Sequence, residues 1–173
     1  MLTLNLILYV FCEEIKLKKN ILRGILLILL LWTFAMIFGF SSQNAEQSGG
    51  LSKKITQNLV NKIPNIEEQK QEQIMDRMEK VIRKIAHFSI YTLVGFLLMA
   101  FVSTYNIPEK TRIISSLLVG MIYASSDEIH QRFVAGRSAQ VTDVMLDTLG
   151  VLFGILILML VLQIADRKKK KAV

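Results

Sequence analysis

Cysteine, proline and aromatic residues are scarce in this chain of 173 residues. Its one cysteine, Cys12, excludes an intramolecular disulfide and a cysteine-rich metal site. Large residues stand before Cys12 where a lipoprotein signal needs small ones, so we interpret it as an ordinary apolar residue. The 2 prolines and 8% aromatic residues accompany 52% hydrophobic residues, a balance typical of lipid-facing helices rather than of a soluble core.

Long apolar stretches, in contrast, are abundant. A helix needs about 20 mostly apolar residues to cross the hydrocarbon core of a bilayer. Stretches of about this length occur at residues 21–40, 85–103, 112–131 and 144–164. The third is marginal by hydropathy because it carries four serines and ends in Asp127-Glu128. The sequence therefore predicts an all-α integral membrane bundle of about four transmembrane helices, with a partly helical external loop.

Basic residues predict how this bundle lies in the membrane. Lys16, Lys18, Lys19 and Arg23 precede or open the first span, residues 41–52 directly after it carry no basic residue, and residues 167–171 form a basic run after the fourth span. Because lysine and arginine resist translocation, both termini are predicted to lie on the cytoplasmic side. This signal explains the basic tail without a nucleic-acid partner.

The predicted organisation follows from these spans. It comprises a cytoplasmic N-terminal segment (1–20), a first transmembrane helix (21–40), an external loop that is partly helical (41–84), a core with three transmembrane helices (85–164) and a basic cytoplasmic tail (165–173). Apolar residues from Ile74 onward keep helical spacing into the second span, which predicts one continuous helix there. Arg83 and Lys84 stand at the translocated end of this span, where topology gives no reason for them.

Polar side chains collect at the external ends of three predicted spans. They are Arg83, Lys84, His87 and Tyr91 on the second span, Asp127, Glu128, His130 and Gln131 on the third, and Asp143 and Asp147 on the fourth. Helical spacing aligns most members of each group on one face. A carboxylate deep in a bilayer costs about 2.5–3.5 kcal/mol, so Asp127, Glu128 and Asp147 are predicted to face the bundle interior and find partners. The loop with Gly136 and Arg137 is predicted to fold back and bring Arg137 near the acids.

Packing alone explains only part of this pattern. Gly150 and Gly154, four residues apart, predict a close approach between helices. Asp127-Glu128-Ile129-His130 contains residue types that bind metals, but its spacing is not a specific zinc motif, so we predict neither a metal nor a cofactor. Two histidines, four acids and four cations at one face exceed what packing requires, which favours a functional cluster. The four cations are Arg83, Lys84, Arg132 and Arg137.

Several motifs carry a resemblance to a known family. They are Arg83 to Phe88 with Tyr91, Asp127 to Phe133, Gly136-Arg137, and Asp143 to Gly150. Together they resemble the VanZ-like family over about residues 80–155, and Phe40-Ser41-Ser42-Gln43 after the first span is also similar to the beginning usual in that family. Phe133 joins the candidate residues through this resemblance. The resemblance implies a multi-pass protein of the bacterial plasma membrane, related to proteins that lower susceptibility to the glycopeptide antibiotic teicoplanin. Family members often have proline at the place of Ala135 and asparagine at the place of Asp147, which gives Asp143 more weight than Asp147.

Three functions remain open from the sequence. In the first, the chain acts at the outer face of the membrane, where its cations bind a phosphate-bearing envelope lipid or a cell-wall precursor. In the second, it is a membrane-embedded enzyme on such a lipid, with His87 or His130 as the general acid or base, although no nucleophile is recognisable. In the third, it is a small lipid transporter. The sequence does not identify a substrate, a reaction or an oligomeric state.

Overall fold

The computed structural model describes residues 2–42, 56–57, 68–135 and 140–171. The long helices are α1 (Leu2–Ser41), α3 (Glu68–Ser103), α4 (Glu109–Gln131) and α5 (Val141–Lys171). Within the described residues there is no strand, which confirms the all-α prediction.

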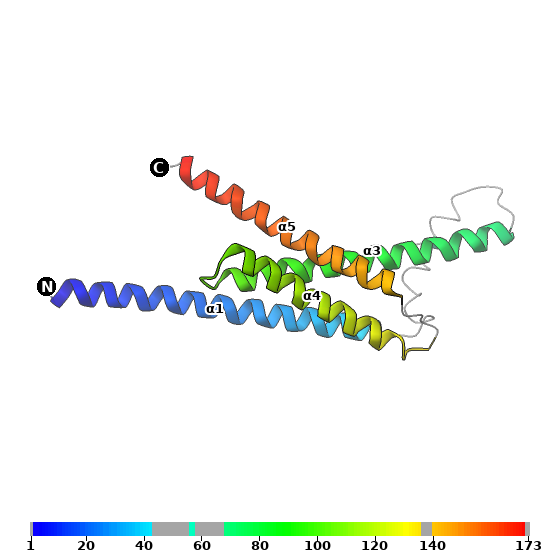
Figure 1. The fold of residues 1–173 in the computed structure, drawn as a ribbon, viewed down its shortest axis with the longest axis horizontal. Helices are drawn as coiled ribbons and strands as arrows, with labels where there is room; N and C mark the ends of the chain where they lie inside the picture. Colours follow the sequence, from blue (N-terminus) through cyan, green and yellow to red (C-terminus); the bar gives the residue numbers. More distant parts are fainter. Residues whose placement is uncertain (1, 43–55, 58–67, 136–139, 172–173) are drawn as a thin grey trace.

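Successive long helices run in opposite directions along a common axis, and both chain termini lie at the same end of the bundle (Figure 1). At that end, Arg23 of α1 donates hydrogen bonds to the carbonyl oxygen and the hydroxyl of Thr104, at 3.0 and 3.1 Å. At the opposite end, the Ser42 hydroxyl lies 3.1 Å from Nε2 of His130. We call this second end, where α1 and α4 finish and α5 begins, the polar end.

Three of these helices are long and apolar enough to cross a membrane: Lys16–Ser41, Glu72–Ser103 and Val141–Lys168. Helix α4 does not reach the same average hydropathy, in line with its marginal sequence. Its outward face is nevertheless apolar, because Ile114, Leu118, Ile122 and Ile129 are exposed. Apolar side chains exposed on every long helix suit hydrocarbon rather than water, as expected of an integral membrane protein.

Two helices extend well beyond the predicted spans. Helix α3 runs without interruption from Glu68 to Ser103, so the continuous helix predicted from Ile74 onward is present. Helix α1 begins at Leu2, so the predicted N-terminal segment and the first span form a single helix. In the predicted external loop, residues 68–84 belong to α3. The remainder of that loop lies outside the described residues, apart from 41–42 and 56–57.

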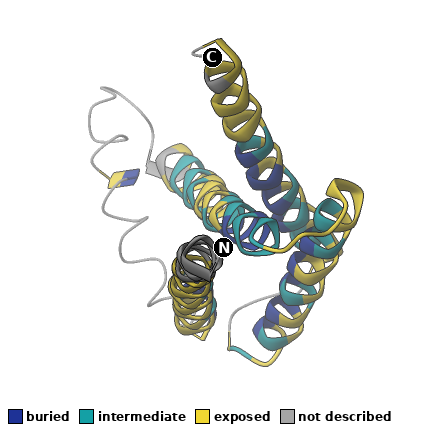
Figure 2. Cartoon of the chain, turned by 90° about the vertical axis from the view of Figure 1, so that its left-hand side faces the viewer, coloured by how far each residue is buried: buried dark blue, intermediate teal, exposed yellow. Residues whose placement is uncertain are grey.

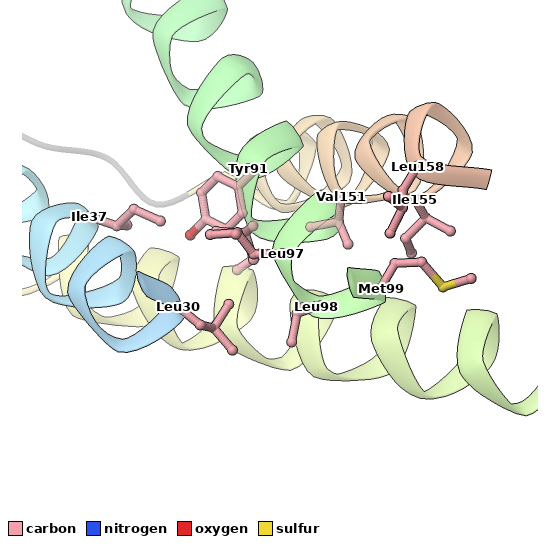
Figure 3. Packing of buried hydrophobic residues seen from close by; sticks show 11 residues of the cluster. Leu30, Ile37, Tyr91, Leu97, Leu98, Met99, Val151, Ile155 and Leu158 are labelled. Atoms are coloured by element: carbon pink, nitrogen blue, oxygen red, sulfur yellow. The ribbon is translucent and has the colours of Figure 1, made fainter. Parts of the chain in front are cut away.

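Helix α3 packs against each of the other three long helices, and its most extensive contact is with α5. The buried apolar side chains lie between the helices (Figure 3) and on their inward faces (Figure 2). Fully or almost fully buried members include Tyr91, Val94 and Met99 of α3 and Val151 and Ile155 of α5.

Glycines let α3 and α5 approach each other closely. A Cβ atom added at Gly150 would lie 2.7 Å from the carbonyl oxygen of Phe88, and one added at Gly154 would lie 2.6 Å from the backbone nitrogen of Phe96. The packing role predicted for these two glycines is therefore confirmed. The same close contact fixes the register of the two helices, and it sets His87 of α3 beside Asp147 of α5.

Candidate functional site

A cavity of about 370 Å³ opens at the polar end, between α3, α4 and α5. Its lining residues are Lys80, Arg83, Lys84 and His87 of α3, Glu128 and Gln131 of α4, Asp143, Leu146 and Asp147 of α5, and Gln140 just before α5. The cations all stand on α3, whereas the acids stand on α4 and α5. One wall of the cavity is therefore basic and the opposite walls are acidic.

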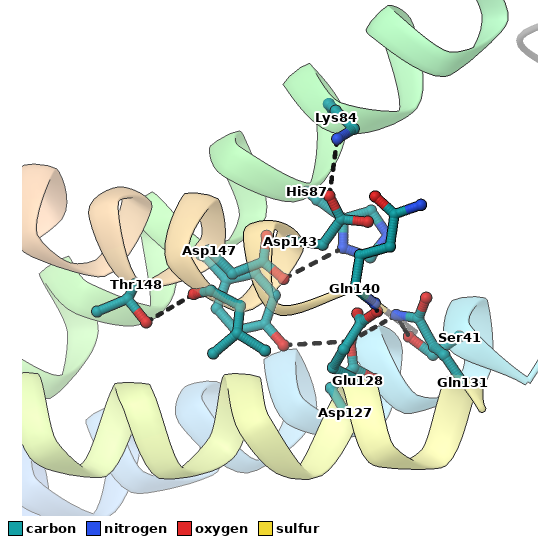
Figure 4. Close-up of polar contacts among 12 residues, drawn as sticks. Ser41, Lys84, His87, Asp127, Glu128, Gln131, Gln140, Asp143, Asp147 and Thr148 are labelled. Carbon is teal, nitrogen blue, oxygen red and sulfur yellow. Dashed lines mark hydrogen bonds and ion pairs between the residues drawn. The ribbon is translucent and has the colours of Figure 1, made fainter. Parts of the chain in front are cut away.

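At the rim, polar contacts connect the helices. Nζ of Lys84 lies 2.8 Å from Oδ1 of Asp143, which links α3 to α5 (Figure 4). Oε1 of Glu128 accepts a 2.6 Å hydrogen bond from the backbone nitrogen of Gln140, which ties the end of α4 to the start of α5. Each of these two acids therefore has a partner from another element, as was predicted for Glu128.

Deeper in the bundle lies a group of buried polar side chains. Nδ1 of His87 is 3.6 Å from Oδ2 of Asp147, whose residue is only 2% exposed. Oδ2 of Asp127 accepts hydrogen bonds from the Tyr91 hydroxyl at 3.2 Å and from Nε2 of Gln131 at 3.0 Å. Oδ1 of Asp127 is buried and has no hydrogen-bond partner among the described residues. These five residues come from three helices, and three of them, His87, Gln131 and Asp147, line the cavity.

Arg83 also has an unusual environment. It lines the cavity, and its Nε atom is buried without a hydrogen-bond partner in the described part of the chain. The neighbouring Lys84 is paired with Asp143, and Lys80 is paired with Asp76 at 2.9 Å. Within the described residues Arg83 is therefore the cavity cation without an ion pair.

Some predicted residues do not join this group. His130 faces α1 instead, where its ring stacks on Phe38 with a centroid separation of 4.5 Å. Phe133 is 82% exposed after the end of α4. Gly136 and Arg137 lie outside the described residues. The structure thus brings together His87 with the acids, but it does not bring the two histidines to one site.

Three contributors were missed by sequence reasoning: Ser41, Lys80 and Gln140. Lys80 had a usable signal, because it precedes Arg83 by three residues and so extends the same helical stripe. Ser41 accepts a 3.3 Å hydrogen bond from Gln131. Ser41 had a signal only in the resemblance, as part of Phe40-Ser41-Ser42-Gln43 after the first span. Gln140 had none, because its contact with Glu128 arises where the ends of two different helices meet.

Comparison with known proteins identifies the family. The protein-family model described as VanZ/LLP1 matches residues 25–162. The chain belongs to the VanZ/LLP1 family. This match confirms the suspected resemblance and gives it wider bounds, residues 25–162. No curated protein and no solved structure gives a significant match to this VanZ/LLP1 chain.

In this VanZ/LLP1 chain, the motifs that carried the resemblance supply most of the cavity lining. The α3 motif contributes Arg83, Lys84 and His87, and the α4 and α5 motifs contribute the acids. Asp147, which departs from the pattern expected of the family, is the more deeply buried of the two α5 acids, whereas Asp143 lies at the rim. The arrangement can bind an anion on its α3 wall, and it can hold a proton or a cation between His87 and the buried carboxylates.

Proposed function

We propose that this VanZ/LLP1 chain is a multi-pass protein of the bacterial plasma membrane that binds a phosphate-bearing envelope lipid at the outer face. The phosphate occupies the cavity at the polar end, and Arg83 is its principal partner. The observation that carries this proposal is the cavity itself, with a basic wall on α3 and a buried Arg83 Nε that has no partner among the described residues.

The distribution of basic residues supports an outward-facing cavity. Lys16, Lys18 and Lys19 precede the apolar part of α1, and residues 167–171 end the chain with a basic run. Both groups lie toward the bundle end opposite the cavity (Figure 1). Basic flanks mark the cytoplasmic side of a membrane protein. Both termini are therefore assigned to the cytoplasm, and the polar end faces outward.

The chemistry of the cavity suits a phosphate. Arginine presents a planar fork of donors that matches a phosphate oxygen pair, and such charge-assisted hydrogen bonds are about twice as strong as neutral ones. The acids of the cavity are already engaged: Asp143 by Lys84, Glu128 by the Gln140 backbone and Asp147 by His87. They therefore compete less for Arg83 than their number suggests. A lipid also reaches the cavity readily, because its chain can remain in the bilayer beside the apolar helices.

The test measures lipid binding by the purified full-length protein in nanodiscs, with EDTA present throughout. The probe is a polyprenyl phosphate, and the uncharged polyprenol is the comparison ligand. Arg83→Gln should weaken phosphate-lipid binding by about tenfold or more, since a hydrogen bond to a charged group contributes about 1.5–3 kcal/mol. Arg77→Gln is the matched control, because Arg77 is exposed on the same helix and does not line the cavity. Equal binding by wild type and Arg83→Gln, or equal losses in both variants, would contradict the proposal.

A cellular consequence concerns antibiotics. We propose that occupancy of this site lowers susceptibility to teicoplanin-type glycopeptides, which act on the cell envelope. A susceptible Gram-positive host that expresses the wild-type chain should show a higher inhibitory concentration of teicoplanin but not of vancomycin. Arg83→Gln should remove this rise, and Arg77→Gln should retain it. If the wild type raises neither inhibitory concentration, the antibiotic role is wrong. The lipid-binding experiment tests the phosphate-lipid ligand independently of that result.

One observation favours a second candidate, a membrane-embedded enzyme on the same lipid class. The 3.6 Å contact between His87 and the buried Asp147 resembles a general base oriented by a carboxylate. Of the two histidines considered from the sequence, only His87 lines the cavity. Purified protein would then release phosphate from a labelled polyprenyl pyrophosphate, and His87→Ala would abolish the release. Absence of turnover by wild-type protein would remove this candidate.

A further inference from the structure

We propose that His87, Asp127 and Asp147 form a binding site for a divalent transition-metal ion such as Zn²⁺ at the inner end of the cavity. One potential ligand atom from each residue lies within 4.8 Å of the other two. Both aspartates are buried, and His87 is partly buried. The three residues come from α3, α4 and α5, so an ion bound there would hold three helices together. This inference does not depend on the lipid proposal.

The distances are close to those that a metal ion requires. Zinc binds histidine nitrogen and carboxylate oxygen at about 2.0–2.2 Å, so two ligands of a tetrahedral site are about 3.4 Å apart. Nδ1 of His87 and Oδ2 of Asp147 are already 3.6 Å apart. The Asp127 oxygen, at no more than 4.8 Å, needs only a modest side-chain movement. Three protein ligands beside an open cavity would leave a fourth position for water or a ligand oxygen.

An unpartnered atom provides independent support. Oδ1 of Asp127 is buried and accepts no hydrogen bond from the described residues, whereas Oδ2 of the same carboxylate accepts two. A buried acceptor without a partner costs about 1–3 kcal/mol, and more when it is charged. A metal ion at Oδ1 would remove this cost and leave the bonds from Tyr91 and Gln131 to Oδ2 intact.

The charge of the cluster points the same way. Two buried carboxylates this close together repel each other, and one imidazolium can neutralise only one of them. The donors to Asp127, Tyr91 and Gln131, are neutral side chains. A dication balances both carboxylates at once. Mixed imidazole and carboxylate ligands suit Zn²⁺ better than Mg²⁺ or Ca²⁺, which prefer oxygen ligands alone.

The test uses full-length protein purified in detergent through a tag without histidines, stripped with EDTA and then dialysed. Titration calorimetry with Zn²⁺ gives the affinity, and elemental analysis gives the stoichiometry. Wild-type protein should bind one Zn²⁺ per chain with micromolar affinity or tighter, and Mg²⁺ should not compete at equal concentration. Asp147→Asn and Asp127→Asn should each weaken Zn²⁺ binding by about tenfold or more. Asp166→Asn, at the far end of α5 and exposed, should bind as wild type does.

A second variant and a spectroscopic measurement distinguish the loss of a metal ligand from the loss of the folded structure. His87→Gln alters a residue at the cavity wall rather than in the core. It should retain the wild-type gel-filtration profile but lose Zn²⁺ affinity. Co²⁺ in the wild-type site should give visible absorption bands that His87→Gln and Asp147→Asn lack. The proposal is overturned if wild-type protein binds no stoichiometric Zn²⁺, or if folded His87→Gln binds it equally well. Because the lipid assay contains EDTA, failure of either proposal leaves the other result interpretable.

Discussion

Replacement of Gly154 by alanine tests whether direct backbone contact between α3 and α5 holds the bundle together. The added methyl group would lie 2.6 Å from the Phe96 nitrogen, where ordinary contact begins at 3.4 Å, and it would also overlap the Thr92 carbonyl oxygen. Both are backbone atoms, so no side chain can rotate away, and the overlap with the Thr92 oxygen requires a larger separation of the helices than the roughly 0.8 Å that the Phe96 contact alone would need. Overpacking of this kind costs about 1–3 kcal/mol. Overlap with backbone atoms places this change at the upper end of that range. The better helix propensity of alanine returns up to about 1 kcal/mol, which leaves a net loss of about 2 kcal/mol.

The assay is thermal denaturation of purified protein in detergent, followed as loss of the monodisperse gel-filtration peak after heating. For a chain of this size, each kcal/mol corresponds to about 2–4 °C, so Gly154→Ala should lower the midpoint by several degrees. Gly39→Ala is the control, because no other atom lies within 4 Å of a Cβ added there. This control should leave the midpoint unchanged or raise it slightly. If Gly154→Ala denatures at the same temperature as Gly39→Ala, α3 and α5 do not pack through their backbones.

Two further predictions concern the polar end and use the same denaturation assay. Tyr91→Phe should destabilise the protein by about 1–2 kcal/mol, because it removes the buried hydrogen bond to Asp127. Tyr105→Phe is the control, because it alters an exposed residue and should change the stability little. An equal effect of the two changes would refute this role of the Tyr91 hydroxyl. A double-mutant cycle with Lys84→Met and Asp143→Asn should give a coupling of only about 0.2–1 kcal/mol that falls with added salt, since these side chains are 49% and 31% exposed. A larger, salt-independent coupling would mean that the pair is effectively buried.

The helices could be predicted from the sequence because the length of an apolar run determines whether it can cross a bilayer. Helical spacing also predicted that Gly150 and Gly154 share a face. It could not identify the atoms of α3 that these glycines contact, because spacing along one helix contains no information about a neighbouring helix. For the same reason the sequence could not separate the two histidines. His87 and His130 both lie near the polar end, but His87 turns toward Asp147 and His130 turns toward Ser42, the residue after α1.

Helix α4 shows why average hydropathy underestimates the ability of a helix to cross a membrane when that helix also contributes to a polar site. Its buried residues include Ser116, Asp127, Glu128 and Gln131, which lower the average without facing lipid. Its exposed residues include Ile114, Leu118, Ile122 and Ile129, at spacings of four, four and seven, which place them on one face. Ser126, exposed on the same face, donates its hydroxyl hydrogen bond to the Tyr123 carbonyl oxygen of the same helix. A helix that presents this face to lipid can cross the bilayer while its opposite face supplies hydrogen-bonding groups to the bundle interior. The deficit in hydropathy and the location of the candidate site therefore share a cause, since Asp127, Glu128 and Gln131 lower the average hydropathy of α4 and also stand at the polar end.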